Sequence, residues 1–314
     1  MKLAKVLTIY IVFQQAIGLR FRTTPRLLRR FCRSVGDVDI ADVQPDAVCA
    51  FLVGKGAITR TWQLRFAVLS SFYRFAMSRG YVDSSPLPTE KPQLPPPFRP
   101  YIYSTEDIKR LIDATEVIRS VRQPLQADTY RTLLLLLYGT GVRIGEALSL
   151  DLRDFDNGAR LLTIRDTKFF KTRYVPVGER LAQELIAFTA RRRRLPMPNG
   201  EASAFFCSYR GTRWRYVHVI TLFQRVRRHA AVRREPESRY QPRLHDLRHS
   251  AAVHRLIAWY RAGRDVQRML PQLSTYLGHE GIRQTQRYLT MTPELLQQAS
   301  LRFEGYAQPE TPHA

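Results

Sequence analysis

The sequence predicts a mainly α-helical fold with a small β-hairpin, an α+β class, arranged as two domains. Three observations support this prediction. Apolar residues recur at three- and four-residue steps through much of the chain, which is the period of an amphipathic helix. Two short segments near the middle alternate as strands do. A proline-rich linker, residues 84–102, separates a helical domain over residues 1–83 from a longer domain over residues 103–305, and residues 306–314 form a polar tail.

The charge of the chain points to an anionic partner. Among 314 residues, 50 are Lys or Arg and 27 are Asp or Glu, which gives a formal charge of +23. Both predicted domains share the excess, as expected for two surfaces that face one polyanion. Nucleic acid or an acidic membrane are the usual partners of such a surplus. No stretch reaches the ~18 apolar residues that a membrane span needs, so we expect no membrane insertion.

The N-terminus and the cysteines bear on the compartment. An apolar run over residues 6–13 weakly mimics a signal peptide, but it is short and ends in two glutamines, so it predicts an amphipathic first helix. The three cysteines are Cys32, Cys49 and Cys207, an odd number without metal-type spacing. Reduced thiols in a cytoplasmic protein are the simplest interpretation.

The clearest helix of the first domain runs from Ile58 to Met77. Its apolar face carries Trp62, Phe66, Leu69, Tyr73 and Ala76. Arg79-Gly80 is a typical helix stop. The arginines of this segment fall on other faces, where they are candidate DNA-binding residues or part of a solvated surface: Arg60, Arg65, Arg74 and Arg79. Because no catalytic motif is found here, we expect this domain to bind and not to react.

The second domain opens with Ser104-Thr105-Glu106-Asp107, a helix start with capping hydroxyls followed by acids. A mostly apolar segment, Tyr130 to Tyr138, predicts a buried helix. The turn Gly139-Thr140-Gly141 then places Arg143 at the start of a helix that runs to Leu150. A guanidinium there is suited to bind an anion. The alternative is a surface ion pair between Arg143 and Glu146, and the two interpretations are equally supported at this point.

Two alternating segments, Leu161–Thr167 and Lys171–Val177, predict a β-hairpin with Lys168-Phe169-Phe170 at its tip. Farther on, residues 242–260 predict a helix with its entry turn. His245 and Arg248 lie three residues apart and would share one face. His245 and His249 have the spacing of a helical zinc pair, but no third ligand is evident, so we favour a phosphate site over a metal site.

The C-terminal part supplies an imidazole and a phenol. Gly278 is the expected C-cap of a helix that ends at Leu277, and His279 follows on the turn. A helix over residues 282–289 would carry Tyr288, and a last short helix would reach about Phe303. A helical tyrosine is usually a half-buried core residue. Only the arginines and histidines of the other motifs favour a functional role for Tyr288.

If these residues converge, they suit phosphoryl transfer from a phosphodiester. Arg143 and Arg248 would hold the phosphate oxygens and stabilise the charge of the transition state. Tyr288, a weak nucleophile at neutral pH, would need a base, for which His245 is the candidate. A lysine at the hairpin tip would protonate the leaving oxygen. Lys168 is preferred and Lys171 is the alternative.

Three motifs together resemble the tyrosine recombinase, or phage integrase, family. They are Gly141-x-Arg143-x-x-Glu146-x-Leu148, His245-x-Leu247-Arg248-His249, and Leu277-Gly278-His279 followed by Tyr288. Their order and spacing agree over roughly residues 103–305, and residues 1–83 resemble the core-binding domain of the family less specifically. There are two departures from the family pattern. Phenylalanines follow Lys168, which weakens its choice over Lys171, and the segment before Tyr288 is Gln284-Thr285-Gln286-Arg287, where the family often has two threonines.

The resemblance implies a fold and an activity. Tyr288 would form a 3′-phosphotyrosyl link, Arg143 and Arg248 would hold the phosphate, His245 would assist proton transfer, His279 would hydrogen-bond the phosphate, and Lys168 would be the general acid. No cofactor, metal or ATP would be needed. The two domains would close as a clamp on double-stranded DNA, and a homo-tetramer on two DNA sites would exchange C-terminal segments, here near Pro293–Phe303.

Three other functions remain to be weighed. A type IB topoisomerase shares the chemistry but rejoins the same strand. A DNA-binding module would use the basic surfaces without catalysis. A zinc hydrolase would use His245 and His249.

Overall fold

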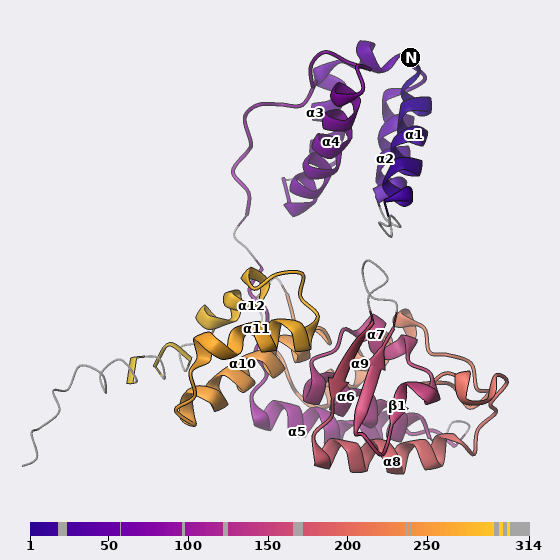
Figure 1. Ribbon diagram of the computed structural model, residues 1–314, viewed down its shortest axis with the longest axis vertical. Helices are drawn as coiled ribbons and strands as arrows, with labels where there is room; N and C mark the ends of the chain where they lie inside the picture. Colours follow the sequence, from indigo (N-terminus) through magenta and orange to yellow (C-terminus); the bar gives the residue numbers. More distant parts are fainter. Residues whose placement is uncertain are drawn as a thin grey trace, which may run out of the picture. The chain divides into compact units, whose positions relative to one another are not determined.

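The computed structural model describes residues 1–17, 24–56, 58–95, 98–121, 125–165, 172–235, 238, 240–291, 295–297 and 300–301. These residues form two compact units, one from residues 1–98 and one from Arg99 onward. Figure 1 shows a helical first unit, and a second unit that is also mostly helical but contains a small sheet. The predicted fold class, mainly α with a small β-sheet, is therefore confirmed. None of the described helices is both long and apolar enough to cross a membrane.

The first unit packs its helices around one apolar core. Its elements are α1 (Leu3–Ala16), α2 (Thr24–Val35), the short η1 (Ile40–Asp42), α3 (Pro45–Val53) and α4 (Arg60–Ser78). Helix α4 contacts the other three α-helices. The predicted first helix is present as α1, with Val6 and Tyr10 buried, but it is not clearly amphipathic because apolar Val12 lies on its exposed side. The predicted apolar face of α4 does face the core. Leu87 and Leu94 of the proline-rich segment also pack against this core.

The second unit begins with α5 (Thr105–Asp113), where Ser104 and Asp107 form the predicted capping interaction. The chain continues through η2 (Ala114–Ile118) and α6 (Gln126–Thr140) to α7 (Ile144–Ser149) and η3 (Leu152–Asp154). Helix α6 is longer than the predicted segment, and most of its leucines are buried, as its composition predicted. It packs between α8 (Glu179–Arg192) and α10 (Asp246–Arg261) and is thus the central helix of this unit.

The sheet is antiparallel, in the order β1 (Phe155–Asp156), β2 (Leu161–Ile164) and β3 (Arg173–Pro176). The predicted hairpin is present, with Leu162 opposite Val175 and Ile164 opposite Arg173. Within the described residues both strands are shorter than predicted. Arg165 lies outside β2, and Thr172 and Val177 lie outside β3. The sequence does not predict β1, because two residues are too few to show an alternating pattern.

The remaining elements are η5 (Gly200–Ala202), α9 (Tyr216–His229), α11 (Val266–Leu277), α12 (Arg283–Gln286) and η6 (Arg287–Thr290). Gly278 ends α11 in the left-handed conformation, as predicted. The prediction of a single helix over residues 282–289 is wrong, because the chain forms the short α12 and then the 3-10 helix η6 there. Tyr288 lies in η6. A second core under α10 and α11 buries Val253, Leu270 and Tyr288 together. The last predicted helix lies mostly outside the described residues.

Candidate active site

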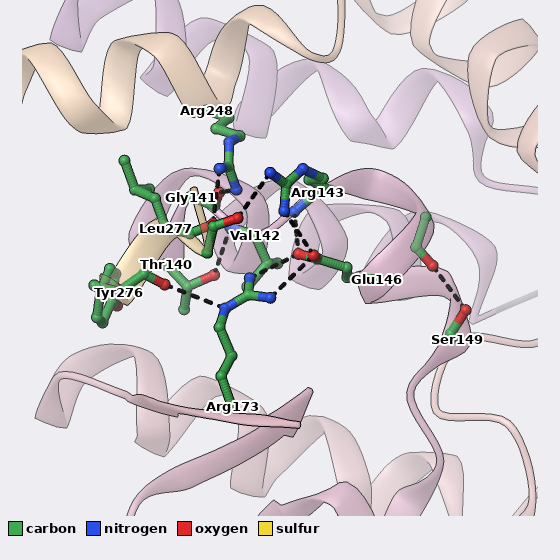
Figure 2. A network of polar contacts seen from close by, with 12 residues as sticks. Thr140, Gly141, Val142, Arg143, Glu146, Ser149, Arg173, Arg248, Tyr276 and Leu277 are labelled. Atoms are coloured by element: carbon green, nitrogen blue, oxygen red, sulfur yellow. Dashed lines mark hydrogen bonds and ion pairs between the residues drawn. The ribbon is translucent and has the colours of Figure 1, made fainter. Parts of the chain in front are cut away.

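Arg143 precedes α7 and contacts both that helix and a distant part of the chain. Gly141, with φ at +63°, ends α6 and turns the chain toward Arg143. The Arg143 backbone N–H and Nη1 donate to the Glu146 carboxylate, each at 2.9 Å. Its Nη2 donates to the carbonyl oxygen of Gly278 at 2.9 Å (Figure 2). The ion pair with Glu146 therefore exists, and the same guanidinium also reaches the turn before His279.

Arg248 lies on α10 and is only 4% exposed. Its Nη1 donates to the carbonyl oxygen of Gly141 at 2.6 Å, and its Nη2 donates to that of Leu277 at 2.7 Å (Figure 2). Burial, followed by the positive charge of Arg143, lowers the pKa of Arg248 to about 10. The group is still protonated at neutral pH, but it is a buried cation without a carboxylate partner among the described residues.

Tyr288 is 2% exposed and lies among aromatic rings. Its ring centroid is 5.6 Å from that of His249 and 6.0 Å from that of His279, to which it is nearly parallel. Burial raises the pKa of the Tyr288 phenol, and the charges of Arg248 and Arg287 oppose this increase. The positive side chains therefore favour the phenolate that a nucleophile requires.

The histidines at this site are held in the neutral form. Burial lowers the pKa of each of His279 and His249 to about 4, and the next cause is the charge of Arg248 for His279 and the neighbouring His245 for His249. Partial burial and the charge of Arg248 also lower the pKa of His245. His279 Nδ1 shares a 2.7 Å hydrogen bond with the buried Thr285 hydroxyl, which leaves Nε2 as its other polar atom. Neutral imidazoles can accept a proton, as the base in the proposed chemistry must.

His245 lies at the N-terminal end of α10, where its ring is 5.1 Å from that of His249 and perpendicular to it. Within the described ranges, no group of three His, Cys, Asp or Glu side chains is arranged to hold a metal ion. The Nδ1 atom of His249 is buried and has no hydrogen-bond partner in the described part of the chain. The ring of His249 thus lies between those of His245 and Tyr288 and contacts both.

Glu146, Arg173 and Thr285 also lie here, although the sequence did not indicate them as site residues. Glu146 was expected only as a surface partner, yet its side chain is 12% exposed and contacts both Arg143 and Arg173. Burial would raise its pKa, but hydrogen bonds and charge from Arg173, then Arg143, hold the pKa at about 2. Arg173 and Thr285 carry no recognisable motif. The one sequence signal that could have indicated Thr285 as a site residue is its position three residues before Tyr288.

The other predicted site residues lie elsewhere or outside the described chain. Lys168 and Lys171 are not among the described residues. Arg60 and Arg74 are exposed on α4. Arg65 Nη1 donates to the carbonyl oxygens of Phe51 and Leu52 at the end of α3, so its guanidinium completes that helix end. Arg79 lies over two phenylalanine rings, each centroid 5.7 Å from its Cζ. DNA contact by these four arginines stays a prediction.

A basic, mainly helical chain thus holds a tyrosine, two arginines and neutral histidines in one site, residue types that suit phosphoryl transfer. The Phage integrase family profile matches residues 103–294. The integrase/recombinase y4rB of Sinorhizobium fredii strain NGR234 is 35% identical over 298 residues, which are 94% of this chain and 95% of that protein. Tyrosine recombinase XerC of Oceanobacillus iheyensis is 28% identical, over 90% of this chain and 88% of that protein.

The solved structure of the Tn1549 transposon integrase in complex with transposon right end DNA has the same fold, with a TM-score of 0.70. It is 17% identical and covers 98% of this chain and 100% of that chain. The chain therefore belongs to the phage integrase family and is a tyrosine-type site-specific recombinase. The resemblance seen in the motifs is confirmed, and neither a topoisomerase nor a non-catalytic DNA-binding module is favoured.

Proposed function

We propose that Tyr288 cleaves one DNA strand through a 3′-phosphotyrosyl intermediate and that the same residues rejoin the strand to a new partner. One observation carries this proposal. A single chain brings the Tyr288 phenol, Arg143, Arg248 and neutral histidines to one site. The one carboxylate described there, that of Glu146, pairs with Arg143 and Arg173 and leaves Arg248 without a carboxylate partner. The surplus of positive charge matches one phosphodiester and the further charge of its transition state.

In the first step, the Tyr288 oxygen attacks phosphorus and the bond from phosphorus to the 5′-oxygen breaks. Arg143 and Arg248 hold the non-bridging oxygens with the N–H groups that are not bonded to backbone carbonyls. His245 receives the phenolic proton, which its lowered pKa allows because the ring is neutral at neutral pH. His279 donates a hydrogen bond to the phosphate from Nε2, since Thr285 occupies Nδ1.

The leaving 5′-oxygen receives a proton from Lys168, with Lys171 as the alternative. Attack by the 5′-hydroxyl of a partner strand reverses the step and releases Tyr288. One phosphate ester bond breaks as another forms at each stage, so the energy of the backbone bond is retained and the cycle needs no nucleotide hydrolysis. The roles assigned here need no cofactor.

The partner is double-stranded DNA, as in the complex of the similar transposon integrase. The family resemblance supports a clamp formed by residues 1–83 and 103–305 with a linker between them, and a homo-tetramer on two DNA sites. The segment near Pro293–Phe303 is the candidate for docking between protomers. Arg60, Arg74 and Arg79 are the exposed members of the predicted DNA-binding set. We place this activity in the cytoplasm and in the movement of a mobile element.

The proposal is tested by trapping the covalent intermediate. The target site is first found by sequencing the genomic DNA that a Tyr288→Phe variant retains. A nicked suicide duplex with that site is then incubated with the parent chain in EDTA and analysed by denaturing electrophoresis. We expect a protein–DNA adduct from the parent and from Tyr260→Phe, a control on α10, and none from Tyr288→Phe. An adduct from Tyr288→Phe, or none from a parent that binds the site, would refute the proposal.

A further inference from the structure

We infer that Arg173 is a positioning residue for strand cleavage, which acts by fixing Arg143 and the turn before His279. This inference rests on the proposed function. Arg173 is the first residue of β3 and its side chain is only 13% exposed, compared with 39% for Arg143. Its Nε, Nη1 and Nη2 atoms all donate hydrogen bonds to groups of the chain itself. Its influence on the reaction must pass through the groups that it touches.

The Arg173 guanidinium forms a two-point contact with Glu146. Its Nη1 and Nη2 donate to the two carboxylate oxygens at 3.0 and 2.8 Å (Figure 2). The same two oxygens accept the backbone N–H and Nη1 of Arg143. Glu146 is therefore shared between a buried arginine and the arginine proposed to bind phosphate. Without Arg173, Glu146 could pair fully with Arg143 and draw it away from the phosphate.

The other side of the Arg173 guanidinium supports the turn that carries His279. Its Nε donates to the carbonyl oxygen of Tyr276 at 3.4 Å, near the end of α11. Gly278 lies so close that an added Cβ would be 2.7 Å from the Arg173 Cζ. The Gly278 carbonyl in turn accepts Nη2 of Arg143. Arg173 thus acts on both partners of the Arg143–Gly278 hydrogen bond. It reaches Arg143 through Glu146, and it lies directly against Gly278.

This geometry requires a planar fork and not only a positive charge. Lysine would retain the charge, but it could not contact both Glu146 oxygens and the Tyr276 carbonyl in one plane. The expected consequence of Arg173→Lys is a displaced Arg143 in a folded protein. A misplacement of about 1 Å can slow a reaction by on the order of a hundredfold. We expect a fall of about tenfold to a hundredfold in the cleavage rate constant.

The test measures single-turnover cleavage of the nicked suicide duplex at saturating enzyme. Arg165→Lys is the matched control, because Arg165 belongs to the same hairpin, directly after β2, but pairs with Asp154 and not with Glu146. We expect Arg173→Lys alone to lower the rate constant, with unchanged DNA affinity. A merely structural role would lower the amplitude through loss of folded enzyme and leave the rate constant as in the parent.

A second duplex carries sulfur in place of the bridging 5′-oxygen, so that the leaving thiolate needs no proton. A defect in the phosphate clamp should persist on this substrate, whereas a defect in the general acid should disappear. We expect Arg173→Lys to remain slow on both duplexes. An unchanged rate constant, or a rate restored by sulfur, would overturn the inference. Absence of an adduct from the parent would instead refute the proposed function itself, so the two failures are distinguishable.

Discussion

Replacing Gly278 by alanine tests how closely Arg173 packs under the active-site turn. Gly278 has a φ of +67°, and the left-handed conformation costs an alanine about 1–2 kcal/mol. The new Cβ would also lie 2.7 Å from the Arg173 Cζ and 2.8 Å from its Nη1, so the guanidinium must shift. Hydrogen bonds to a charged group contribute about 1.5–3 kcal/mol, and one such contact would be lost. We expect Gly278→Ala to lower the free energy of unfolding by about 2.5–5 kcal/mol.

Gly263 provides a control with the same backbone conformation. Its φ is +64°, but nothing lies within 4 Å of a Cβ added there. Gly263→Ala should therefore cost only the left-handed penalty of about 1–2 kcal/mol. Urea unfolding can be followed by tryptophan fluorescence in a Trp62→Phe background. The signal then comes from Trp214 and Trp259, both in the second unit.

Two results would refute this reasoning. Equal destabilisation by the two alanines would mean that Arg173 does not press against Gly278. The second result comes from a double-mutant cycle with Arg173→Ala, which removes the obstructing side chain. In that background, Gly278→Ala should cost no more than Gly263→Ala does. A penalty that stays at its full size would show that Arg173 is not its source.

Three further predictions concern single features of the two units. Thr285→Val removes the hydroxyl bonded to His279 Nδ1, and we expect cleavage to slow by about tenfold with DNA affinity unchanged, measured by single turnover. Arg65→Ala should destabilise the first unit by about 1.5–3 kcal/mol in thermal unfolding, whereas Arg74→Ala should leave stability unchanged and weaken DNA binding with a shallower salt dependence. The lowered pKa values of His279 and His249, about 4, mean that the unfolded chain takes up protons first as the pH falls. The stability that these histidines contribute is full above about pH 6.5 and is lost toward pH 4, so the urea midpoint should fall over that range, and less so for His249→Phe.

Much of the fold was predictable because its signals are local. The capping interaction of Ser104 and the left-handed end of α11 at Gly278 depend on residues within one turn of each other. The buried face of α4 follows from a helical period that needs no knowledge of the partner helices. Arg143 and Arg248 could be chosen as site residues because their motifs combine residue types that suit a phosphate.

The remaining features depend on contacts between distant segments. Arg143 and Gly278 are 135 residues apart, and Arg173 and Glu146 are 27 residues apart, so no spacing rule joins them. Arg65 illustrates a different limit. The helical period places it off the apolar face of α4, but the period alone does not distinguish open solvent from the carbonyl end of a neighbouring helix. Tyr288 was expected on a regular helix, whereas the chain there tightens into a 3-10 turn.

The free energy needed to bury the charged Arg248 side chain bears on how the proposed site would favour the transition state. Burial and Arg143 lower the pKa of Arg248 from 12.5 to about 10, so its charged form is destabilised by about 3 kcal/mol in the absence of an anion. Two backbone carbonyls orient the guanidinium but supply no full negative charge. In the proposed mechanism, a bound phosphodiester would relieve part of this destabilisation, and the more highly charged transition state would relieve more. Interactions that strengthen on the way to the transition state increase the rate itself, whereas uniform binding does not. A buried, incompletely neutralised arginine is therefore better suited to catalysis than one already paired with a carboxylate.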